Sequence, residues 1–559
     1  MKQPILRIIN INKRYTFEDG GEINALRDIS FDLYNNEILG IIGPSGGGKT
    51  TLLRIIHGSE PFDSGEIQID HICIRPSSTE EEIQKLLNMT SIHLQRSVSL
   101  WDTTVFDNII RRFIALDTGD ETLPLAYEEK KYKKWERAAI NLLKVVELEH
   151  KIDHPVATLS GGEKQRVVLA RQLATIGFRK IALIDEPLTM SDLNIRKKIL
   201  KWMREMKDKT SMIITSHNPQ LLYGTADRIM HLDGKIIDIG GEEVIKNFVN
   251  QMEEPLPLMP HTDKIVLEVK NLRKEYHFAG VDNKYFSVPF ELKNISFKLY
   301  EKEILAIVGL TGVGKSVLLN LLTGEETPTD GDIIYFIKDK KMNIKEDKLK
   351  IVGNIGYIPQ ELDLPYTANI KDLAYARLGL IGERPIIFAK KRANKLDLKW
   401  DLIEPYFIKF INSESSTSEF LNDMKDVGLD EEKIKDLFII PPWEADDLID
   451  LIFNLLYLPT DVLQRRVYEL SVGERVRVAI GIEILNKPKV LFLDEPFGDL
   501  DVVTLRTVCN TLKEINDKLG ISMVLVSHQI DFIKEVAHRA IQLYNGEIIY
   551  VGNPENVTV

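Results

Sequence analysis

Cysteine is nearly absent from the sequence: its 559 residues include two, Cys73 and Cys509. Two thiols are too few for a cysteine-ligated zinc site, an iron–sulfur cluster or a disulfide framework. Long apolar runs are also missing, since no stretch reaches the roughly 18 uncharged apolar residues that a membrane-spanning helix needs. Residues 1–12 lack the apolar core of a signal peptide. We therefore expect a cytoplasmic protein that does not itself insert into a membrane.

An excess of basic residues is lacking too. The chain has 72 Lys and Arg against 84 Asp and Glu, a formal net charge of −12. This balance argues against nucleic acid as a main partner. The hydrophobic fraction of 44% and the charged fraction of 28% are typical of globular domains. At roughly 150 residues per domain, the length predicts more than one domain.

The chain contains an internal repeat. The segments GPSGGGKT (residues 43–50) and GLTGVGKS (residues 309–316) both fit the pattern G-x-x-x-x-G-K-[ST]. Further pairs follow in one order: a glutamine, the motifs LSGGE and LSVGE, the motifs IDEP and LDEP, and the motifs TSH and VSH. The pairs lie about 265 residues apart up to the glutamines and about 310 apart afterwards. The second copy therefore carries an insertion of about 46 residues between these landmarks.

A short segment with three prolines, residues 253–263, separates the copies and favours an extended linker. We place the first domain at residues 1–252 and the second at residues 264–559, with a helical insertion at about 385–450. The runs KIALIDE and KVLFLDE are typical of buried strands in a sheet covered on both faces. The predicted fold class is α/β, with two tandem P-loop domains.

The glycine-rich loops are predicted to bind a polyphosphate. Glycines let backbone N–H groups turn toward the ligand, and the following helix offers its positive end. The lysine would reach the β- and γ-phosphates, and the hydroxyl beside it would bind Mg²⁺. Each loop lies between a predicted strand and a predicted helix, which favours phosphate binding over a structural turn. The predicted binding residues are Gly43, Ser45, Gly46, Gly48, Lys49, Thr50 and Thr51 in the first copy and Gly309, Thr311, Gly312, Gly314, Lys315 and Ser316 in the second.

An acidic pair ends a later strand in each copy. Asp185 and Asp494 are predicted to hold Mg²⁺, and Glu186 and Glu495 to polarise the attacking water. An Asp-Glu pair at a strand end is also typical of a helix N-cap, with which the following proline agrees. The upstream glycine-rich loop favours the catalytic interpretation.

Three further matched pairs complete the predicted sites. They are Gln95 and Gln360, His217 and His528, and Tyr15 and Tyr276. The glutamines would orient water or Mg²⁺, the histidines would contact the γ-phosphate, and the tyrosines would stack on adenine. A lone strand-end histidine is usually structural, but two at matched positions favour a functional role. For the tyrosines, packing in the core is an equally good interpretation.

Together these motifs resemble the ATP-binding cassette superfamily over nearly the whole chain, and LSGGE is similar to the family's signature motif. The resemblance implies an ATPase that uses ATP and Mg²⁺, with a helical subdomain in each cassette. It also implies that the two cassettes pair within the chain, so that the signature of one closes over ATP held by the other. The implied signature residues are Ser160, Gly161, Gly162 and Glu163 in the first copy and Ser471, Gly473 and Glu474 in the second, and Asp192 and Asp501 match the family's D-loop.

In overall organisation the chain is similar to the ATP-binding component of the methyl-coenzyme M reductase activation system of methanogens. That resemblance implies ATP-dependent reductive activation of the reductase, with the reductase and other activation proteins as partners. The alternative is a fused ATP-binding subunit of a membrane importer. The segments RSVSLWDTTVFDNI and ELDLPYTANIKDL, which follow the glutamines, would form a docking surface for either kind of partner.

Two differences between the copies have consequences. Residues 413–450 hold twelve Asp or Glu against three Lys, a pattern typical of a solvated helical face but also suited to docking a partner. Val472 stands where the first signature has Gly161. A β-branched residue restricts the backbone, so we expect the site of Glu186 to close less readily, unless Val472 points away. On this basis Glu495→Gln lowers turnover more than Glu186→Gln.

Overall fold

A computed structural model shows how most of the chain folds. The described residues are 3–17, 20–93, 100–122, 128–159, 161–186, 193–275, 291–309, 313–381, 383–411, 415–438, 440–498, 500–527 and 529–557. They divide into two compact units: unit 1 holds the described residues up to Glu253 together with 500–504, and unit 2 holds the rest. No helix within the described ranges is both long and apolar enough to cross a membrane.

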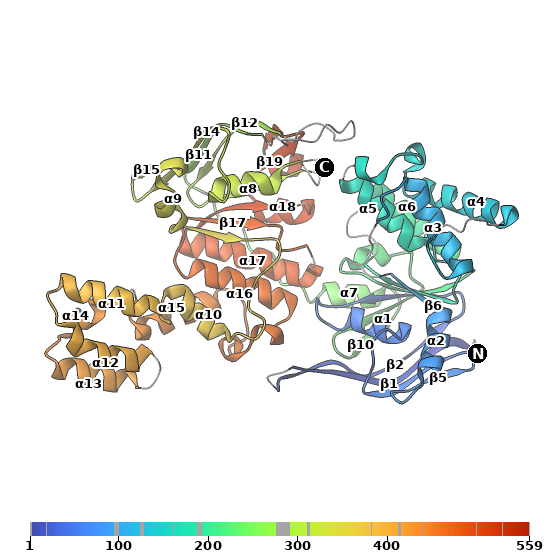
Figure 1. The fold of residues 1–559 in the computed structure, drawn as a ribbon, viewed down its shortest axis with the longest axis horizontal. Helices are drawn as coiled ribbons and strands as arrows, with labels where there is room; N and C mark the ends of the chain where they lie inside the picture. The colour runs from blue at the N-terminus through green and yellow to red at the C-terminus, as the bar shows by residue number, and fades with distance from the viewer. Residues whose placement is uncertain are drawn as a thin grey trace. The chain divides into compact units, whose positions relative to one another are not determined.

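Unit 1 is built around a six-stranded sheet in the order β10-β9-β3-β8-β7-β6. Figure 1 labels its two edge strands, β6 and β10. All neighbouring strands are parallel except β9 and β10. Every position of β3, β7 and β8 is buried, as expected of a sheet covered on both faces. The strands are β3 (Ile38–Ile42), β6 (Thr90–His93), β7 (Ile181–Asp185), β8 (Ser211–Thr215), β9 (Arg228–Leu232) and β10 (Ile236–Gly240).

Successive residues of these strands enter two different hydrophobic cores. Leu183 lies in the core formed with α1 and an antiparallel sheet of order β2-β1-β4-β5, whereas Ile184 lies in the core formed with α3 to α7. The remaining elements of unit 1 are β1 (Pro4–Thr16), β2 (Glu22–Tyr34), β4 (Ser64–Ile69), β5 (Ile72–Ile74), α1 (Lys49–His57), α2 (Glu80–Met89), α3 (Val105–Thr118), α4 (Glu129–Val145), α5 (Gly161–Leu173), α6 (Leu193–Met206) and α7 (Glu243–Val249).

Unit 2 repeats this arrangement. Its six-stranded sheet has the order β20-β19-β13-β18-β17-β16 and its antiparallel sheet the order β12-β11-β14-β15. Each strand therefore occupies the place of its counterpart in unit 1. The strands are β11 (Ile265–Glu275), β12 (Glu291–Tyr300), β13 (Ile304–Val308), β14 (Asp330–Ile337), β15 (Lys340–Asn343), β16 (Ile355–Ile358), β17 (Val490–Asp494), β18 (Ser522–Val526), β19 (Arg539–Tyr544) and β20 (Glu547–Gly552). The helices outside the insertion are α8 (Lys315–Thr323), α9 (Ile344–Val352), α10 (Ile370–Leu378), α15 (Pro442–Asn454), α16 (Val472–Ile484), α17 (Val502–Leu519) and α18 (Ile530–Val536).

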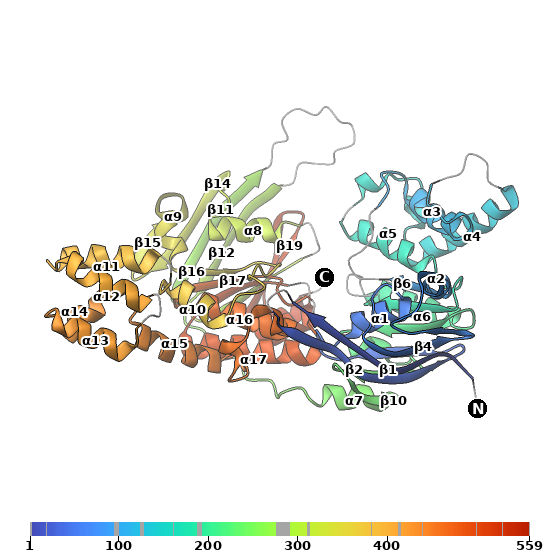
Figure 2. The same cartoon turned by 60° about the horizontal axis from the view of Figure 1, so that its bottom comes forward.

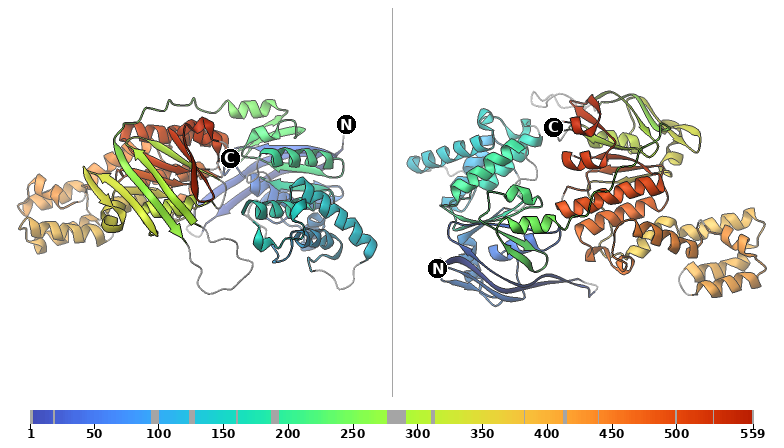
Figure 3. Two further views of the ribbon diagram at one scale, coloured as in Figure 1. Left: turned by 90° about the horizontal axis from the view of Figure 1, so that it is seen from above. Right: turned by 180° about the vertical axis from the view of Figure 1, so that it is seen from behind.

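The insertion forms a helical lobe, defined here as residues 383–438. Figures 2 and 3 show it beside the sheets of unit 2. The lobe has its own core, in which Phe407 stacks on Phe438 at 5.0 Å between ring centroids. The predicted insertion also reached into α15, but α15 packs on α10 and α16. The helices of the lobe are α11 (Glu383–Lys395), α12 (Trp400–Ile411), α13 (Thr417–Asp426) and α14 (Glu431–Asp436).

The proline-rich segment after Glu253 lies along unit 2. The N–H of Leu256 donates to Asn510 Oδ1 at 2.9 Å, and Lys513 Nζ donates to the carbonyl oxygen of Leu256 at 2.8 Å. Farther along, His538 Nε2 donates to the carbonyl oxygen of Met259 at 2.7 Å. Residues 253–262 form neither helix nor strand, and these hydrogen bonds fix the segment to unit 2.

Candidate functional site

Each glycine-rich loop joins a central strand to a helix, β3 to α1 and β13 to α8. Gly48 and Gly314, which immediately precede the helices, have φ of 88° and 102°, in the left-handed region that favours glycine. A Cβ atom on Gly43 would lie 2.0 Å from the carbonyl oxygen of Leu232, and one on Gly309 would lie 2.6 Å from that of Leu543. These positions accept no side chain, so the shape of the loops fits close approach of a phosphate to the backbone.

The two loop lysines begin α1 and α8 and are buried. Lys49 Nζ donates to the carbonyl oxygen of Gly43 at 2.9 Å, and Lys315 Nζ donates to that of Gly309 at 2.9 Å. Burial lowers the pKa of Lys49, and the nearby carboxylate of Glu186 opposes this shift. The lysines thus lie at the centre of the predicted phosphate sites.

A hydroxyl–carboxylate pair stands beside each lysine. Thr50 Oγ1 donates to Asp185 Oδ2 at 2.8 Å, and Ser316 Oγ donates to Asp494 Oδ1 at 3.4 Å. Hydroxyl and carboxylate oxygens are ligands that Mg²⁺ prefers, so both pairs fit that ion. Burial raises the pKa of Asp494, and the hydrogen bond from Ser316 opposes the shift.

The two glutamates after these aspartates have an uncommon backbone. Glu186 has φ of 54° and Glu495 has φ of 50°, a strained conformation that concentrates at functional sites. His217 Nε2 lies 2.7 Å from Glu186 Oε1, and Lys315 Nζ lies 3.6 Å from Glu495 Oε1. Asp494 and Glu495 do not cap a helix in the second copy, because the next helix, α17, begins only at Val502.

The signature motifs begin helices. In the second copy Ser471 is the N-cap of α16: its hydroxyl accepts from the N–H of Glu474 at 3.2 Å, and Glu474 Oε2 accepts from the N–H of Ser471 at 2.8 Å. The S-x-x-E of this signature is therefore a capping box. In the first copy α5 begins at Gly161, and Glu163 pairs with Lys151 at 2.6 Å.

Val472 does not restrict the backbone of the second signature in the way that the sequence suggested. This residue is the first of α16, where the backbone is helical and accepts valine without a glycine-like conformation. The backbone restriction that the sequence suggested for this signature therefore has no structural basis. Gly473, next to it, is buried in the same helix.

Tyr15 lies beside the first glycine-rich loop. Its hydroxyl hydrogen-bonds to Thr51 of α1, and burial raises its pKa. Lys13 Nζ lies 4.7 Å from the centre of the ring and 2.9 Å from Glu60 Oε1. In the second copy Lys274 pairs with Glu326 at 3.3 Å, so this ion pair is repeated.

This lysine–glutamate pair is not among the predicted site residues, although its matched position in both copies is visible in the sequence. The remaining predicted residues fall into two groups. Gln360 is exposed just after β16, and Asp501 caps α17 by accepting from the N–H groups of Val503 and Thr504. Outside the described residues lie Gln95, Ser160, Asp192, Tyr276, Thr311, Gly312 and His528.

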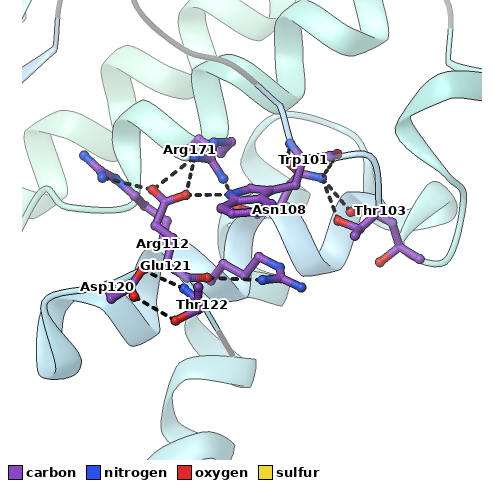
Figure 4. Close-up of polar contacts among 10 residues, drawn as sticks. Trp101, Thr103, Asn108, Arg112, Asp120, Glu121, Thr122 and Arg171 are labelled. Atoms are coloured by element: carbon purple, nitrogen blue, oxygen red, sulfur yellow. Dashed lines mark hydrogen bonds and ion pairs between the residues drawn. The ribbon is translucent and has the colours of Figure 1, made fainter. Parts of the chain in front are cut away.

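A polar cluster organises the segment that follows the first glutamine (Figure 4). Glu121 accepts from Trp101 Nε1 at 2.8 Å, from Arg171 Nη2 at 2.7 Å and from Arg112 Nη1 at 3.1 Å. Trp101 is nevertheless 40% exposed. At the equivalent position of the second copy, Tyr366 is 50% exposed. Each copy therefore presents an aromatic ring six residues after its glutamine.

Comparison with known proteins places the chain in a family. Residues 26–189 and 292–498 match the family model described as ABC transporter. An uncharacterized ABC transporter ATP-binding protein of Methanocaldococcus jannaschii is 38% identical, covering 99% of this chain and 96% of its own. A ribose import ATP-binding protein of Bacillus licheniformis is 26% identical, covering 97% and 96%.

Among solved structures, a chain from the complex of an archaeal ribosomal stalk protein and an archaeal ribosome recycling factor resembles this one. It covers 97% of this chain and 90% of its own, with a TM-score of 0.50 and 19% identity, a likeness that shows the fold alone. The two family matches confirm the predicted cassettes and the α/β fold. The chain belongs to the ABC transporter family, as an ATP-binding cassette ATPase with two tandem cassettes.

Proposed function

We propose that the chain binds two Mg·ATP and hydrolyses them with Glu186 and Glu495 as general bases. The observation that carries this proposal is the repeated group of a buried lysine, a hydroxyl–carboxylate pair and a glutamate with positive φ. When bound, Mg²⁺ neutralises charge on the transferring phosphoryl group. His217 is placed to orient Glu186 through their 2.7 Å contact.

We also propose that the two cassettes pair within the chain. Each signature helix, α5 or α16, would direct its N-terminus toward the nucleotide held by the other cassette, where N–H groups and the helix dipole favour negative charge. A covalent linker raises the effective concentration of one cassette for the other. Analytical ultracentrifugation tests this proposal: it predicts that ATP binding makes the Glu186→Gln/Glu495→Gln variant more compact while it stays monomeric.

We propose methyl-coenzyme M reductase as the partner. ATP turnover by this chain would drive the reductive activation of that enzyme. The relatives in Methanocaldococcus jannaschii, a methanogen, support this assignment, as does the acidic part of the lobe as a docking element. Coupling would require the ATPase cycle to move the lobe or the helical parts of the cassettes against the bound partner.

The experiment that tests this partner is an anaerobic pull-down from methanogen cells followed by an activation assay. Replacing the lobe, residues 383–438, with a short Gly/Ser linker keeps both nucleotide sites, because the lobe has its own core. We expect this variant to bind and hydrolyse ATP like the full chain but to lose activation. Normal activation by the deletion variant contradicts docking through the lobe.

A second candidate is a fused ATP-binding subunit of a membrane importer. The exposed rings of Trp101 and Tyr366, at equivalent positions of the two copies, favour a repeated docking surface of the kind that two similar membrane subunits would use. The name of the ribose import relative also supports it. Recovery of a permease in the pull-down, lost in Trp101→Ala and Tyr366→Ala, would establish this function instead of the first.

A further inference from the structure

Thr215, at the end of β8, touches both acidic residues of the first site. In the sheet β8 lies next to β7, and Thr215 is paired in register with Asp185. Thr215 Oγ1 donates to Asp185 Oδ1 at 2.7 Å and accepts from the N–H of Glu186 at 3.1 Å. The side chain is fully buried. One hydroxyl therefore joins the predicted metal ligand to the predicted general base.

The second copy has valine at the same place. Val526 is paired in register with Asp494, as Thr215 is with Asp185. Its side chain has no hydroxyl and lies in the hydrophobic core that the six-stranded sheet of unit 2 forms with α8 and the antiparallel sheet. The N–H of Glu495 donates instead to the carbonyl oxygen of Val526 at 3.1 Å. Among the described residues, Asp494 accepts from one hydroxyl, that of Ser316 at 3.4 Å.

We infer that Thr215 is a positioning residue for Asp185, which makes the first site bind Mg²⁺ with nucleotide more tightly than the second. This inference rests on the proposed function, in which Asp185 and Asp494 hold Mg²⁺. The asymmetry that it adds lies at the first position of the matched motifs TSH and VSH, which is threonine in the first copy and valine in the second.

The physical reason is preorganisation of a metal ligand. Asp185 has one carboxylate oxygen held by Thr215 and the other by Thr50, so its torsion angle is set before a cation arrives. Within the part of the chain that the structure describes, Asp494 accepts one long hydrogen bond from a hydroxyl, so it must lose more side-chain freedom on binding. Outer hydrogen-bond partners of metal ligands typically change metal affinity by about 10- to 100-fold when they are removed.

The test measures Mg²⁺ dependence at one site at a time in the full chain. Lys315→Ala leaves the first site competent, and Lys49→Ala leaves the second. Binding of a fluorescent ATP analogue at fixed concentration is followed by anisotropy while Mg²⁺ is titrated, and electron paramagnetic resonance of Mn²⁺ reads the ion directly. The variants are Thr215→Val and Val526→Thr, which exchange the residues of the two copies, with Thr215→Ser and Asp185→Asn as controls.

We expect Thr215→Val to raise the Mg²⁺ midpoint of the first site about tenfold and Thr215→Ser to leave it nearly unchanged. Val526→Thr should lower the midpoint of the second site. The inference is overturned if Asp185→Asn shifts the midpoint and Thr215→Val does not, or if serine shifts it as much as valine. If Asp185→Asn itself leaves the midpoint unchanged, the proposed metal site is wrong and the inference falls with it.

Discussion

The two cassettes keep the same predicted chemical groups and differ in the residues that surround them. Glu186 and Glu495 share a left-handed backbone. Beside them, however, the first copy has the hydroxyl of Thr215, where the second has the methyl groups of Val526. The matched motifs predict two equivalent nucleotide sites. The strand beside the acidic pair, β8 or β18, gives the two aspartates that are predicted to bind Mg²⁺ different hydrogen-bond partners. Similar motifs therefore do not establish similar sites.

A second difference between the copies concerns the histidines that end α1 and β6. The first copy buries His93 and partly buries His57, and the corresponding residues of the second copy are Ile358 and Thr323. Burial lowers the pKa of His57 to about 4 and that of His93 to about 3. The first copy therefore contains groups that favour their neutral form and that the second copy lacks at these positions.

The largest effect that we expect is on turnover. The Glu186→Gln/Glu495→Gln double variant should lose about 100-fold or more in ATP hydrolysis, because general-base catalysis typically contributes about 10²- to 10⁴-fold. At limiting Mg²⁺, Glu186→Gln should lose more activity than Glu495→Gln, since the first site is the better organised one. Phosphate release measures both comparisons.

The sequence led us to expect the opposite order, with the larger loss of turnover in Glu495→Gln. That expectation rested on a backbone restriction at Val472, and the helical backbone there removes its basis. Equal activity of the two single variants at every Mg²⁺ concentration would mean that the two sites work alike. A double variant as active as the parent would contradict the assignment of the general bases.

Removing either loop lysine should abolish one nucleotide site and leave the other. Truncating a buried charged partner typically costs about 2–5 kcal/mol, which corresponds to about 30-fold or more in affinity. Isothermal titration calorimetry should then find one bound nucleotide in Lys49→Ala, one in Lys315→Ala and none in the double variant. Two nucleotides in the double variant would show that the sites lie elsewhere.

Acid should destabilise the first copy through His93. Its pKa of about 3 in the folded chain lies below the unfolded value of about 6.5, so its neutral form contributes full stability above about pH 6.5. That stability is lost as pH falls toward 3, by about 1.4 kcal/mol per pH unit. Hydrogen exchange between pH 7 and 5 should show β6 and β7 losing protection.

His93→Ile places the residue of the second copy at this position and serves as the matched variant. It should flatten the pH dependence of protection in the first copy and leave that of the second unchanged. The same pH slope in the parent and in His93→Ile would exclude His93 as the source. Thr175, which lies 3.2 Å from His93 Nε2, loses its partner in the variant, so absolute stability also falls.

The smallest effect should come from Val472→Gly. Val472 occupies the first turn of α16 without backbone strain, so the glycine should change ATP turnover less than about twofold and cost less than about 1 kcal/mol of helix stability. Steady-state kinetics and thermal unfolding measure the two quantities. A severalfold rise in turnover would show that Val472 does restrict closure of the first site, as the sequence suggested.

Much of the architecture could be predicted from the sequence, because it follows from local patterns. The apolar runs ending in Asp185 and Asp494 are buried strands, and the glycine-rich loops precede helices that begin at the lysines. The capping box of Ser471 also follows from a local pattern, because the spacing S-x-x-E is typical of a helix N-terminus.

The contact between Thr215 and Asp185 could not be predicted in the same way. It joins residues 30 apart in sequence, and it exists because β7 and β8 are paired in one particular register. A register shift of one residue would turn the Thr215 side chain to the opposite face of the sheet. The core of the lobe is another such case, because its aromatic contacts depend on how four helices pack.

The left-handed backbone at Glu186 and Glu495 also matters for protein engineering. A residue other than glycine, asparagine or aspartate is disfavoured there by about 1–2 kcal/mol. Asparagine tolerates this conformation, so Glu186→Asn and Glu495→Asn should relieve strain while they remove the carboxylates. A selection for heat resistance alone would then enrich inactive variants at these two positions, and such a selection should be paired with a screen for ATP turnover.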